Sequence, residues 1–320
     1  MGLSIDSTRF LMQAQKSGVR FDETLTLGRQ HMMVSPERLE AFLREYGAWP
    51  PPEGETEFRR EMSAGSWRFE TLARALGAKN VSSMDASAYE GATLVHDLNQ
   101  SIPSEWQENY DLVVDGGTLE HVFNFPVAIA NCMKLVKTGG HLILLTPTNN
   151  YCGHGFYQFS PELIYRVLAR ENGFQVLRMI GLAESIGQAS LFGVKYPFLI
   201  RGPWYSVRDP AEVRKRVELI NHKPTLLMVL AKKISREAIF AKTPQQSDYV
   251  PQWQQGANAN PMGQSEKGGR TANWLRSMFS ESFCREVLPQ LALILNPFRL
   301  ARFRRQQSFH NKESFQRLEK

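Results

Sequence analysis

Acidic residues follow three of the apolar runs in this sequence, at the places where buried strands would end. Asp85, Asp97 and Asp115 each stand at or just beyond such a run. A carboxylate at the end of a parallel strand can accept two hydrogen bonds from a ribose diol, as Asp85 would, or one from an adenine amine, as Asp97 would. A single aspartate at such a place is as often a turn or helix cap. Three of them in consecutive strand-to-helix loops favour a nucleotide-type ligand.

Two histidines lie in loops that would open at the same edge of the sheet. His121 follows Glu120, and His154 lies in residues 149–160, a loop dense in Asn, Tyr and Gln between glycines. A histidine beside a bound hydroxyl or amine can act as a general base, and loops carry function more often than the elements they connect. Each histidine has a plainer alternative, which is a structural hydrogen bond at a helix start or to a neighbouring carbonyl.

The local spacing of histidine and cysteine does not indicate metal ligation. The seven histidines include no HxxxH pair, and Cys132, Cys152 and Cys284 form no CxxC. We therefore predict no metal site. Three widely spaced cysteines also argue against a disulfide framework, so a reducing cytosol is the simplest location.

The residues from Tyr110 to Asn150 would position both histidine loops. An apolar run at 112–114 breaks at Asp115-Gly116-Gly117, a helix is predicted from about Phe125 to Val136, and a second apolar run follows at 142–145. This pattern is one βαβ unit, with its loops at the carboxyl ends of its strands. In open parallel sheets, ligands bind at those ends.

The remaining elements alternate in the manner of a doubly wound α/β sheet. Ser35-Pro36 and Ser160-Pro161 each supply a side-chain cap and a proline suited to the first helical position. Caps and apolar periodicity predict helices within 1–21 and at 36–46, 67–76 and 161–172, and strands at 23–28, 80–84, 93–95, 174–182 and 225–231. Together with the central unit, these elements make a Rossmann-like, mostly parallel sheet of about seven strands.

Two segments of the main domain, which we place at residues 1–240, fall outside the sheet pattern. Residues 47–66 hold three consecutive prolines and many charges, so we expect an exposed insertion. Residues 183–224 carry aromatics, glycines and prolines without a clear period, and a charged helix is predicted near 211–219. The segment 183–224 either caps an acceptor site or simply packs on the domain.

The C-terminal part of the chain differs in composition and charge. Residues 241–272, rich in Gln, Asn, Gly and Ser, predict a flexible linker, and 273–320 predict a basic amphipathic helical tail. Seven Lys or Arg and two acidic residues in 299–320 carry most of the net charge of +6. The main domain is therefore nearly neutral, and no nucleic-acid partner is expected. Residues 273–305 suit contact with a protein or with the inner membrane face, and docking on the chain's own core is the alternative.

One motif series extends through the central unit. It comprises Asp97-Leu98-Asn99, Pro103, Tyr110-Asp111-Leu112-Val113, Gly117-Thr118-Leu119-Glu120-His121-Val122 and Lys137-Thr138-Gly139-Gly140-His141. On these residues the chain resembles the class I S-adenosylmethionine-dependent methyltransferases, over roughly residues 22–233 and most specifically over 80–150. The resemblance implies a sheet ordered 3-2-1-4-5-7-6, with the seventh strand antiparallel.

The resemblance also implies that S-adenosylmethionine is the cofactor. Asp85 would hold its ribose, Asp97 and Leu98 its adenine, and Gly116, Gly117 and Thr118 its methionine side, with Glu120 and His121 at the mouth of the methyl donor. The family's first strand normally ends in a glycine-rich loop such as GxGxG. This chain has Leu27-Gly28-Arg29-Gln30-His31 there. Gly28 is retained, and Arg29 either bonds the cofactor carboxylate or fills the space that the cofactor needs.

Two functions remain open on these residues. The first is a methyltransferase for a small molecule such as a sugar or glycan precursor, with His121 and His154 as catalytic residues and Asn149, Asn150 and Tyr157 contacting the acceptor. The second is a catalytically inactive methyltransferase-like module for binding or assembly. A nicotinamide-dependent oxidoreductase would need GxGxxG after the first strand, and the sequence has none there.

Overall fold

The computed structural model describes residues 2–63, 68–183, 185–191, 194–200, 202–249, 305 and 307–318. The chain divides into two compact units. The first comprises Met1–Val207, His222–Pro244 and Arg317–Lys320, and the second comprises Arg208–Asn221 and Gln245–Gln316. Most of the predicted linker, and the predicted tail from 273 to 304, lie outside the described residues.

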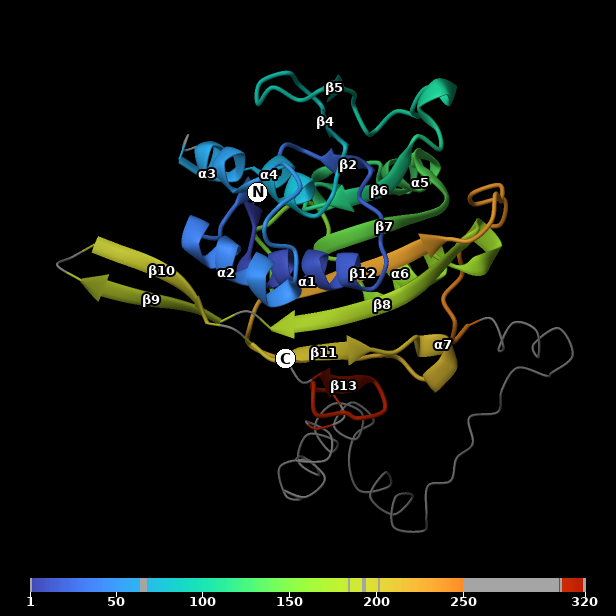
Figure 1. The fold of residues 1–320 in the computed structure, drawn as a ribbon. Helices are drawn as coiled ribbons and strands as arrows, with labels where there is room; N and C mark the ends of the chain where they lie inside the picture. The colour runs from blue at the N-terminus through green and yellow to red at the C-terminus, as the bar shows by residue number, and fades with distance from the viewer. Residues whose placement is uncertain are drawn as a thin grey trace, which may run out of the picture. The chain divides into compact units, whose positions relative to one another are not determined.

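A mixed sheet forms the centre of the first unit, in the strand order β11-β8-β12-β7-β6-β2-β4-β5 (Figure 1). The strands from β5 to β7 run parallel to one another, whereas β12 is antiparallel to both β7 and β8. The bounds are β2 (Glu23–Leu27), β4 (Asn80–Asp85), β5 (Leu94–Val95), β6 (Tyr110–Asp115), β7 (Val136–Asn149), β8 (Phe174–Ala183), β11 (Trp204–Val207) and β12 (Thr225–Lys233).

The α/β class is confirmed, but the sheet has more strands than the predicted seven. Strand β11 lies within the segment 183–224 and pairs with β8 in antiparallel fashion. The same segment also forms the antiparallel hairpin β9 (Ser185–Leu191) and β10 (Val194–Ile200). The short strands β1 (Gly2–Leu3) and β3 (His31–Met32) pair separately, and β13 (Phe315–Leu318) runs from the second unit into the first.

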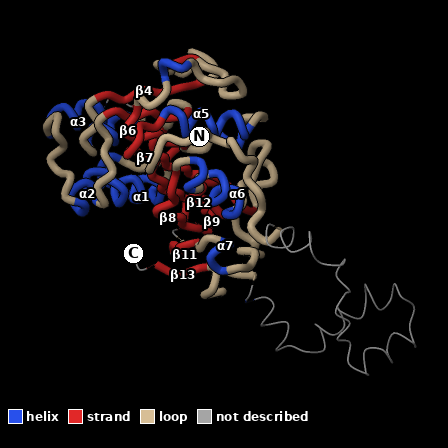
Figure 2. The backbone as a smooth tube through the Cα atoms, turned by 90° about the vertical axis from the view of Figure 1, so that its right-hand side faces the viewer, coloured by secondary structure: helices blue, strands red, loops and turns tan. Residues whose placement is uncertain are grey.

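Helices cover both faces of the sheet. Figure 2 shows α1, α2 and α3 on one side of the strands and α5 and α6 on the other. As the sequence predicts, Ser35 and Ser160 accept hydrogen bonds from the first turns of α2 and α6, each with proline at the start of its helix. The bounds are α1 (Ile5–Lys16), α2 (Pro36–Tyr46), α3 (Glu55–Ser63), α4 (Phe69–Ala75), α5 (Phe125–Leu135) and α6 (Pro161–Val167).

Alternate residues of the central strands bury their side chains on opposite faces. Leu112 and Val114 of β6, with Met228 and Leu230 of β12, join one hydrophobic core with residues of α1 to α4. Val113 is fully buried too, and the period of two places it on the face covered by α5. Burial on both faces gives these strands the continuous apolar runs from which the sequence predicts them.

The prediction of an exposed insertion at residues 47–66 is wrong. Helix α3 lies inside this segment, and its Phe58 and Met62 are 1% and 7% exposed within the main core. The Phe58 ring meets that of Trp49 edge-on, with centroids 5.4 Å apart. Two apolar residues four positions apart are enough to bury one face of a short helix, and the charges and prolines around them hide this stripe in the sequence.

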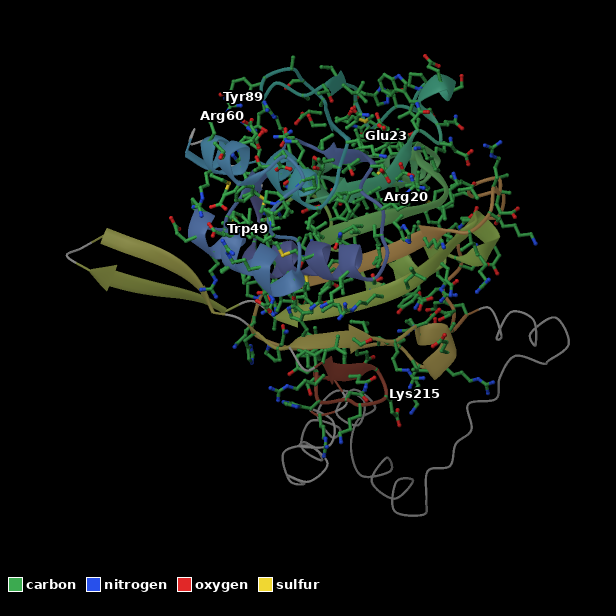
Figure 3. The ribbon with its side chains drawn as sticks, in the orientation of Figure 1. Arg20, Glu23, Trp49, Arg60, Tyr89 and Lys215 are labelled. Atoms are coloured by element: carbon green, nitrogen blue, oxygen red, sulfur yellow. The ribbon has the colours of Figure 1, made fainter. Side chains whose placement is uncertain are left out.

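The described part of the second unit is small. The helix predicted near 211–219 is only α7 (Pro210–Val213), because Arg214 takes a left-handed conformation with φ +53° and ends it. Ion pairs connect Lys215 (Figure 3) to Glu313 and Arg216 to Asp248, each at 2.7 Å. None of the helices in the described part of the chain has the length and hydropathy of a membrane span.

Replacing Phe58 with alanine tests whether α3 belongs to the core. Because Phe58 is buried, we expect Phe58→Ala to lower the free energy of unfolding by about 3–5 kcal/mol in urea titration. The control is Tyr89→Ala, since Tyr89 is 93% exposed (Figure 3), and its effect should stay within about 0.5 kcal/mol. Equal, small effects of the two substitutions would contradict the placement of α3.

Candidate functional site

The order of the sheet reverses at β2. Strand β4 follows on one side of β2, and after β5 the chain returns to form β6 on the other side. Strands β2 and β6 pair in parallel, with Leu27 opposite Asp115 at their carboxyl ends. The loops that follow these two strands therefore diverge from one point, which is where open α/β sheets bind their ligands.

Gly28 makes a tight turn at the end of β2. Its φ is +66°, and its N–H donates to the Met84 carbonyl at 2.7 Å. A Cβ on this residue would lie 3.2 Å from both Thr118 Oγ1 and Gln30 Nε2. The left-handed backbone and the close neighbours both require glycine here.

Gln30, which the sequence reading did not select, is buried between the ends of β2 and β6. It is 3% exposed, and its Nε2 donates to the Leu27 carbonyl at 2.7 Å. A Cβ on Gly116 would lie 2.7 Å from the Gln30 side chain, so this side chain packs directly on Gly116. Its Oε1 is buried and accepts no hydrogen bond from the described residues. Only its position two residues after Gly28 could have suggested a role.

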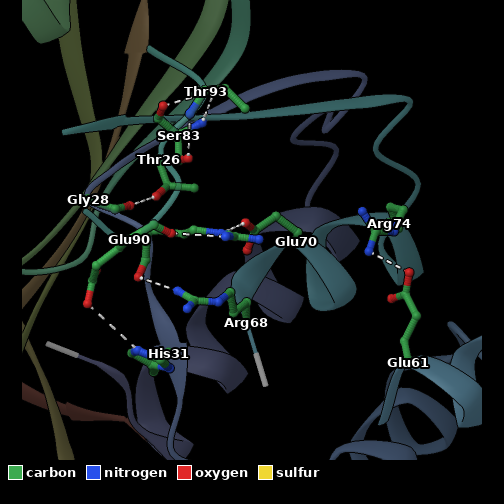
Figure 4. A network of polar contacts seen from close by, with 11 residues as sticks. Thr26, Gly28, His31, Glu61, Arg68, Glu70, Arg74, Ser83, Glu90 and Thr93 are labelled. Atoms are coloured by element: carbon green, nitrogen blue, oxygen red, sulfur yellow. Dashed lines mark hydrogen bonds and ion pairs between the residues drawn. The ribbon is translucent and has the colours of Figure 1, made fainter. Parts of the chain in front are cut away.

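Arg29 turns toward a carboxylate of its own chain. Its Nε donates to Glu70 Oε1 on α4 at 2.8 Å, and its Nη1 donates to the Glu90 carbonyl at 3.0 Å. Figure 4 shows Glu70 and Glu90 in this network, with His31 4.0 Å from the Glu90 carboxylate. The guanidinium thus braces the turn against α4 and the loop after β4, and the two roles considered from the sequence stay predictions.

Asp85 is the last residue of β4, and Asp97 lies just after β5, as the sequence indicates. Asp85 Oδ2 lies 3.9 Å from the position of a Cβ on Gly28, so this carboxylate is beside the glycine turn. Its Oδ1 accepts from the Ser87 N–H at 3.4 Å. Asp97 accepts two bonds from Asn99, which lower its pKa. Both aspartates therefore make local turn contacts, and Leu98, which follows Asp97, is 5% exposed.

Asp115 and Glu120 are two carboxylates buried at the end of β6, and both are 0% exposed. Asp115 Oδ1 accepts from the N–H groups of Thr118 and Leu119 at 2.8 and 3.4 Å. Its Oδ2, and both carboxylate oxygens of Glu120, have no hydrogen-bond donor among the described residues. Burial raises the pKa of Asp115 to about 6, and burial with the Asp115 charge raises the pKa of Glu120 to about 8.

The loop after β7 closes over Glu120. The N–H groups of Phe156 and Tyr157 donate to the Glu120 carbonyl at 2.7 and 3.2 Å. Gly155 has a φ of +74°, and a Cβ there would lie 2.7 Å from the same carbonyl oxygen. This close approach fixes the loop on the short 3₁₀ turn Leu119–His121, which follows β6.

Glu120, His121 and His154 come together as a result. His154 Nε2 lies 3.5 Å from Glu120 Oε1, and the two imidazole centroids are 4.9 Å apart. One potential ligand atom from each residue lies within 4.8 Å of the others, so the three could hold a metal ion. The spacing of histidine and cysteine along the sequence predicts no metal site, whereas these three residues come from two separate loops. Burial and the neighbouring His154 lower the pKa of His121.

The residues predicted to contact an acceptor have structural bonds in the same loop. Asn149 pairs with Thr225 across β7 and β12. Asn150 has a φ of +58° and donates to the Lys223 carbonyl at 2.9 Å. The Tyr157 hydroxyl donates to the Phe123 carbonyl at 2.6 Å. These bonds hold the loop, and contact with an acceptor stays a prediction.

Aromatic rings border this loop. Tyr157 stacks on Phe159 at 5.8 Å, and Phe159 contacts Phe125 at 4.5 Å. Phe123 and Phe156, with centroids 5.9 Å apart, are 72% and 67% exposed. The loop therefore has a buried aromatic anchor and an exposed aromatic pair next to the histidines.

No protein-family model and no curated protein matches this sequence. In fold, the chain is similar to solved methyltransferase structures. One is a Bacillus halodurans protein assigned provisionally as a methyltransferase, with 11% identity and a TM-score of 0.37 over 72% of this chain and 100% of that one. Another is an S-adenosylmethionine-dependent O-methyltransferase of Thermotoga maritima, with 12% identity and a TM-score of 0.30 over 73% and 67%.

A third structure is the trans-methyltransferase CalH in complex with S-adenosylhomocysteine, with 13% identity and a TM-score of 0.33 over 70% of this chain and 54% of that one. At such identities and TM-scores, the likeness does not identify an activity for this chain.

The raised pKa of Glu120 predicts that the protein loses stability as the pH rises. Between about pH 4.5 and about pH 8, Glu120 is ionised when unfolded and protonated when folded, so the folded state binds more protons. The free energy of unfolding should then fall by up to about 1.4 kcal/mol per pH unit relative to Glu120→Gln. Urea titrations from pH 5 to 9 with EDTA present would measure this. A pH-independent difference between the two proteins would contradict the burial of an unpartnered carboxylate.

Two glycines of the same loop provide a matched pair of substitutions. Gly155→Ala puts a side chain on a left-handed backbone and against the Glu120 carbonyl, so we expect a loss of about 1–3 kcal/mol in the free energy of unfolding. A Cβ on Gly153 would meet nothing within 4 Å, so Gly153→Ala should stay within about 0.5 kcal/mol. Similar losses in both variants would show that the loop does not rest on Glu120.

Proposed function

We propose that this chain is a class I S-adenosylmethionine-dependent methyltransferase that acts on a small molecule. The observation that carries this is Asp85, a carboxylate at the end of β4 directly beside the glycine turn of β2. The order β5-β4-β2-β6-β7-β12-β8 supports it, since with these strands numbered in sequence it is 3-2-1-4-5-7-6, with the antiparallel strand next to last. A carboxylate that binds ribose, beside the switch point where the strand order reverses, is typical of nucleotide-binding sheets.

The residues at the switch point fit this cofactor by their chemistry. Asp85 would accept from the ribose hydroxyls, and Asp97 and Leu98 would contact the adenine. Gly116, Gly117 and Thr118 would line the methionine part. Gln30 Oε1 and Asp115 Oδ2 are buried acceptors without a donor among the described residues, and the ammonium group of a methionine moiety would supply one. Arg29, held by Glu70, would order the glycine turn.

The histidine side would receive the acceptor. When bound, the cofactor supplies an electrophilic methyl group on a sulfonium, so the protein's main task is to align the acceptor with it. The lowered pKa of His121 keeps its imidazole neutral at pH 7 and able to take a proton from a hydroxyl or amine. His154 lies close enough to share this task.

A sugar or glycan precursor would suit the chemistry of the loop after β7. Small-molecule sites combine aromatic surfaces with a few placed polar groups. The exposed rings of Phe123 and Phe156 supply the first, and the amides of Asn149 and Asn150 with the Tyr157 hydroxyl supply the second.

One observation favours the second function, a catalytically inactive binding or assembly module. The Gln30 side chain packs on Gly116 and reaches Gly28, where the cofactor's methionine part would lie. Cofactor binding requires the Gln30 side chain to rotate out of this space. A chain in which Gln30 keeps its place would retain the fold and bind no S-adenosylmethionine.

Calorimetric titration with S-adenosylhomocysteine separates these functions. We expect binding by the full chain and a loss of at least about tenfold in affinity for Asp85→Asn, which removes one charged acceptor from the ribose. Glu105→Gln, at an exposed carboxylate away from the switch point, is the control. Absence of S-adenosylhomocysteine binding at millimolar ligand would overturn the proposal that the chain is an enzyme. If the Gln30→Ala variant then bound the ligand, the inactive module would be supported. Methyl-transfer assays on nucleotide sugars, lipids and proteins would then identify the acceptor class.

A further inference from the structure

We propose that Glu120, His121 and His154 form a binding site for a divalent metal ion of the first transition row. The two imidazoles and the carboxylate converge from the 3₁₀ turn after β6 and the loop after β7. Their candidate ligand atoms all lie within 4.8 Å of one another. The proposal concerns ion binding alone and does not depend on methyl transfer; while an ion is bound, its ligand nitrogens on His121 and His154 have no lone pair to take a proton from an acceptor.

The distances between the candidate ligand atoms are close to those found around a bound metal ion. Ligand atoms about 2.0–2.2 Å from one ion lie roughly 3–4 Å apart. The pair formed by His154 Nε2 and Glu120 Oε1 already has this spacing, at 3.5 Å. His121 is exposed, and its potential ligand atom lies within 4.8 Å of those of the other two residues.

The state of Glu120 is an independent observation that points to a cation. Its side chain is 0% exposed, and both carboxylate oxygens lack a hydrogen-bond donor among the described residues. A buried carboxylate that accepts no hydrogen bond is costly, because it has lost its water without a hydrogen bond in exchange. A bound dication would supply the missing partner at the point that this carboxylate shares with the two imidazoles.

The backbone around the cluster is fixed in the way that a metal site requires. Two N–H groups of the loop after β7 bind the Glu120 carbonyl, and Gly155 approaches the same carbonyl too closely for any other residue. The position of His154 relative to Glu120 is therefore set before an ion arrives. Preorganised ligands of this kind favour tight and selective binding.

The ligand types select the class of ion. Two imidazoles with one carboxylate suit Zn²⁺, Fe²⁺, Mn²⁺ or Co²⁺, whereas Mg²⁺ and Ca²⁺ prefer oxygen ligands throughout. Three protein ligands leave one or more positions for water or for an oxygen atom of a small molecule, as in catalytic rather than structural sites. The His154 side chain is 34% exposed, which gives the ion a path to the buried Glu120.

The test uses the full chain after removal of metals with EDTA. Calorimetry with ZnCl₂ should show one ion per chain, and Co²⁺ should give visible absorption bands that Zn²⁺ displaces. We expect His154→Ala and His121→Ala each to weaken binding by at least about tenfold. Cys152→Ser and His222→Ala remove other exposed potential ligands, and both should stay within about twofold of the parent chain. A MgCl₂ titration should give much weaker binding.

Several outcomes would overturn the site. The first is no Zn²⁺ binding at about 0.1 mM ion, since protein sites of this type bind far more tightly than that. The second is an equal loss of Zn²⁺ affinity in Cys152→Ser and His154→Ala. The third is an unchanged Zn²⁺ affinity in both histidine variants. Thermal melting of each metal-free variant checks that it folds, and Gly153→Ala should bind Zn²⁺ as the parent does. Zn²⁺ binding without S-adenosylhomocysteine binding would sink the proposed function and keep the metal site, and the reverse result would sink the metal site alone.

Discussion

The central constraint in this structure is the burial of two carboxylates at the end of β6. Asp115 and Glu120 are both fully buried, and only one of their four oxygens accepts a hydrogen bond from the described residues. Burial of an ionised carboxylate without a partner costs several kcal/mol. The folded chain therefore either keeps a proton there, as the raised pKa values of both groups indicate, or receives a cation from outside. The metal site proposed at Glu120 follows from that alternative.

The sheet imposes this constraint through its register. Strands β6 and β7 are parallel, with Val114 opposite Ile143 and Asp115 opposite Leu144, and β7 continues past this pair to Asn149. The loops that follow must pack on each other, and Gly155 allows the second loop to rest on the Glu120 carbonyl. That contact covers Glu120 and brings His154 to it. Two histidines distant in the sequence therefore become neighbours through strand pairing.

The sequence predicted what depends on local patterns and missed what depends on packing between distant segments. The serine and proline caps predicted α2 and α6, and the apolar runs of β4 and β6 placed Asp85 and Asp115 at strand ends, because these signals lie within a few residues. Helix α3 was missed because two buried residues among charges make a weak stripe. The sequence predicted Glu120, His121 and His154 as site residues, but it did not predict Gln30 or the convergence of these three side chains, because nothing local marks a side chain that meets another loop.

The cofactor side and the metal side share Asp115. Asp115 Oδ1 accepts a hydrogen bond from the Leu119 N–H, in the turn that leads to Glu120. Asp115 also pairs with Leu27 at the end of β2, which Gly28 and Gln30 follow. A positive charge on either side would favour the ionised form of the carboxylate beside it, and the Asp115 charge raises the pKa of Glu120. If both proposals hold, an ammonium group near Asp115 and an ion at Glu120 would act on the same buried charges. The two ligands would then influence each other's affinity reciprocally, through electrostatics alone and without any movement of the sheet.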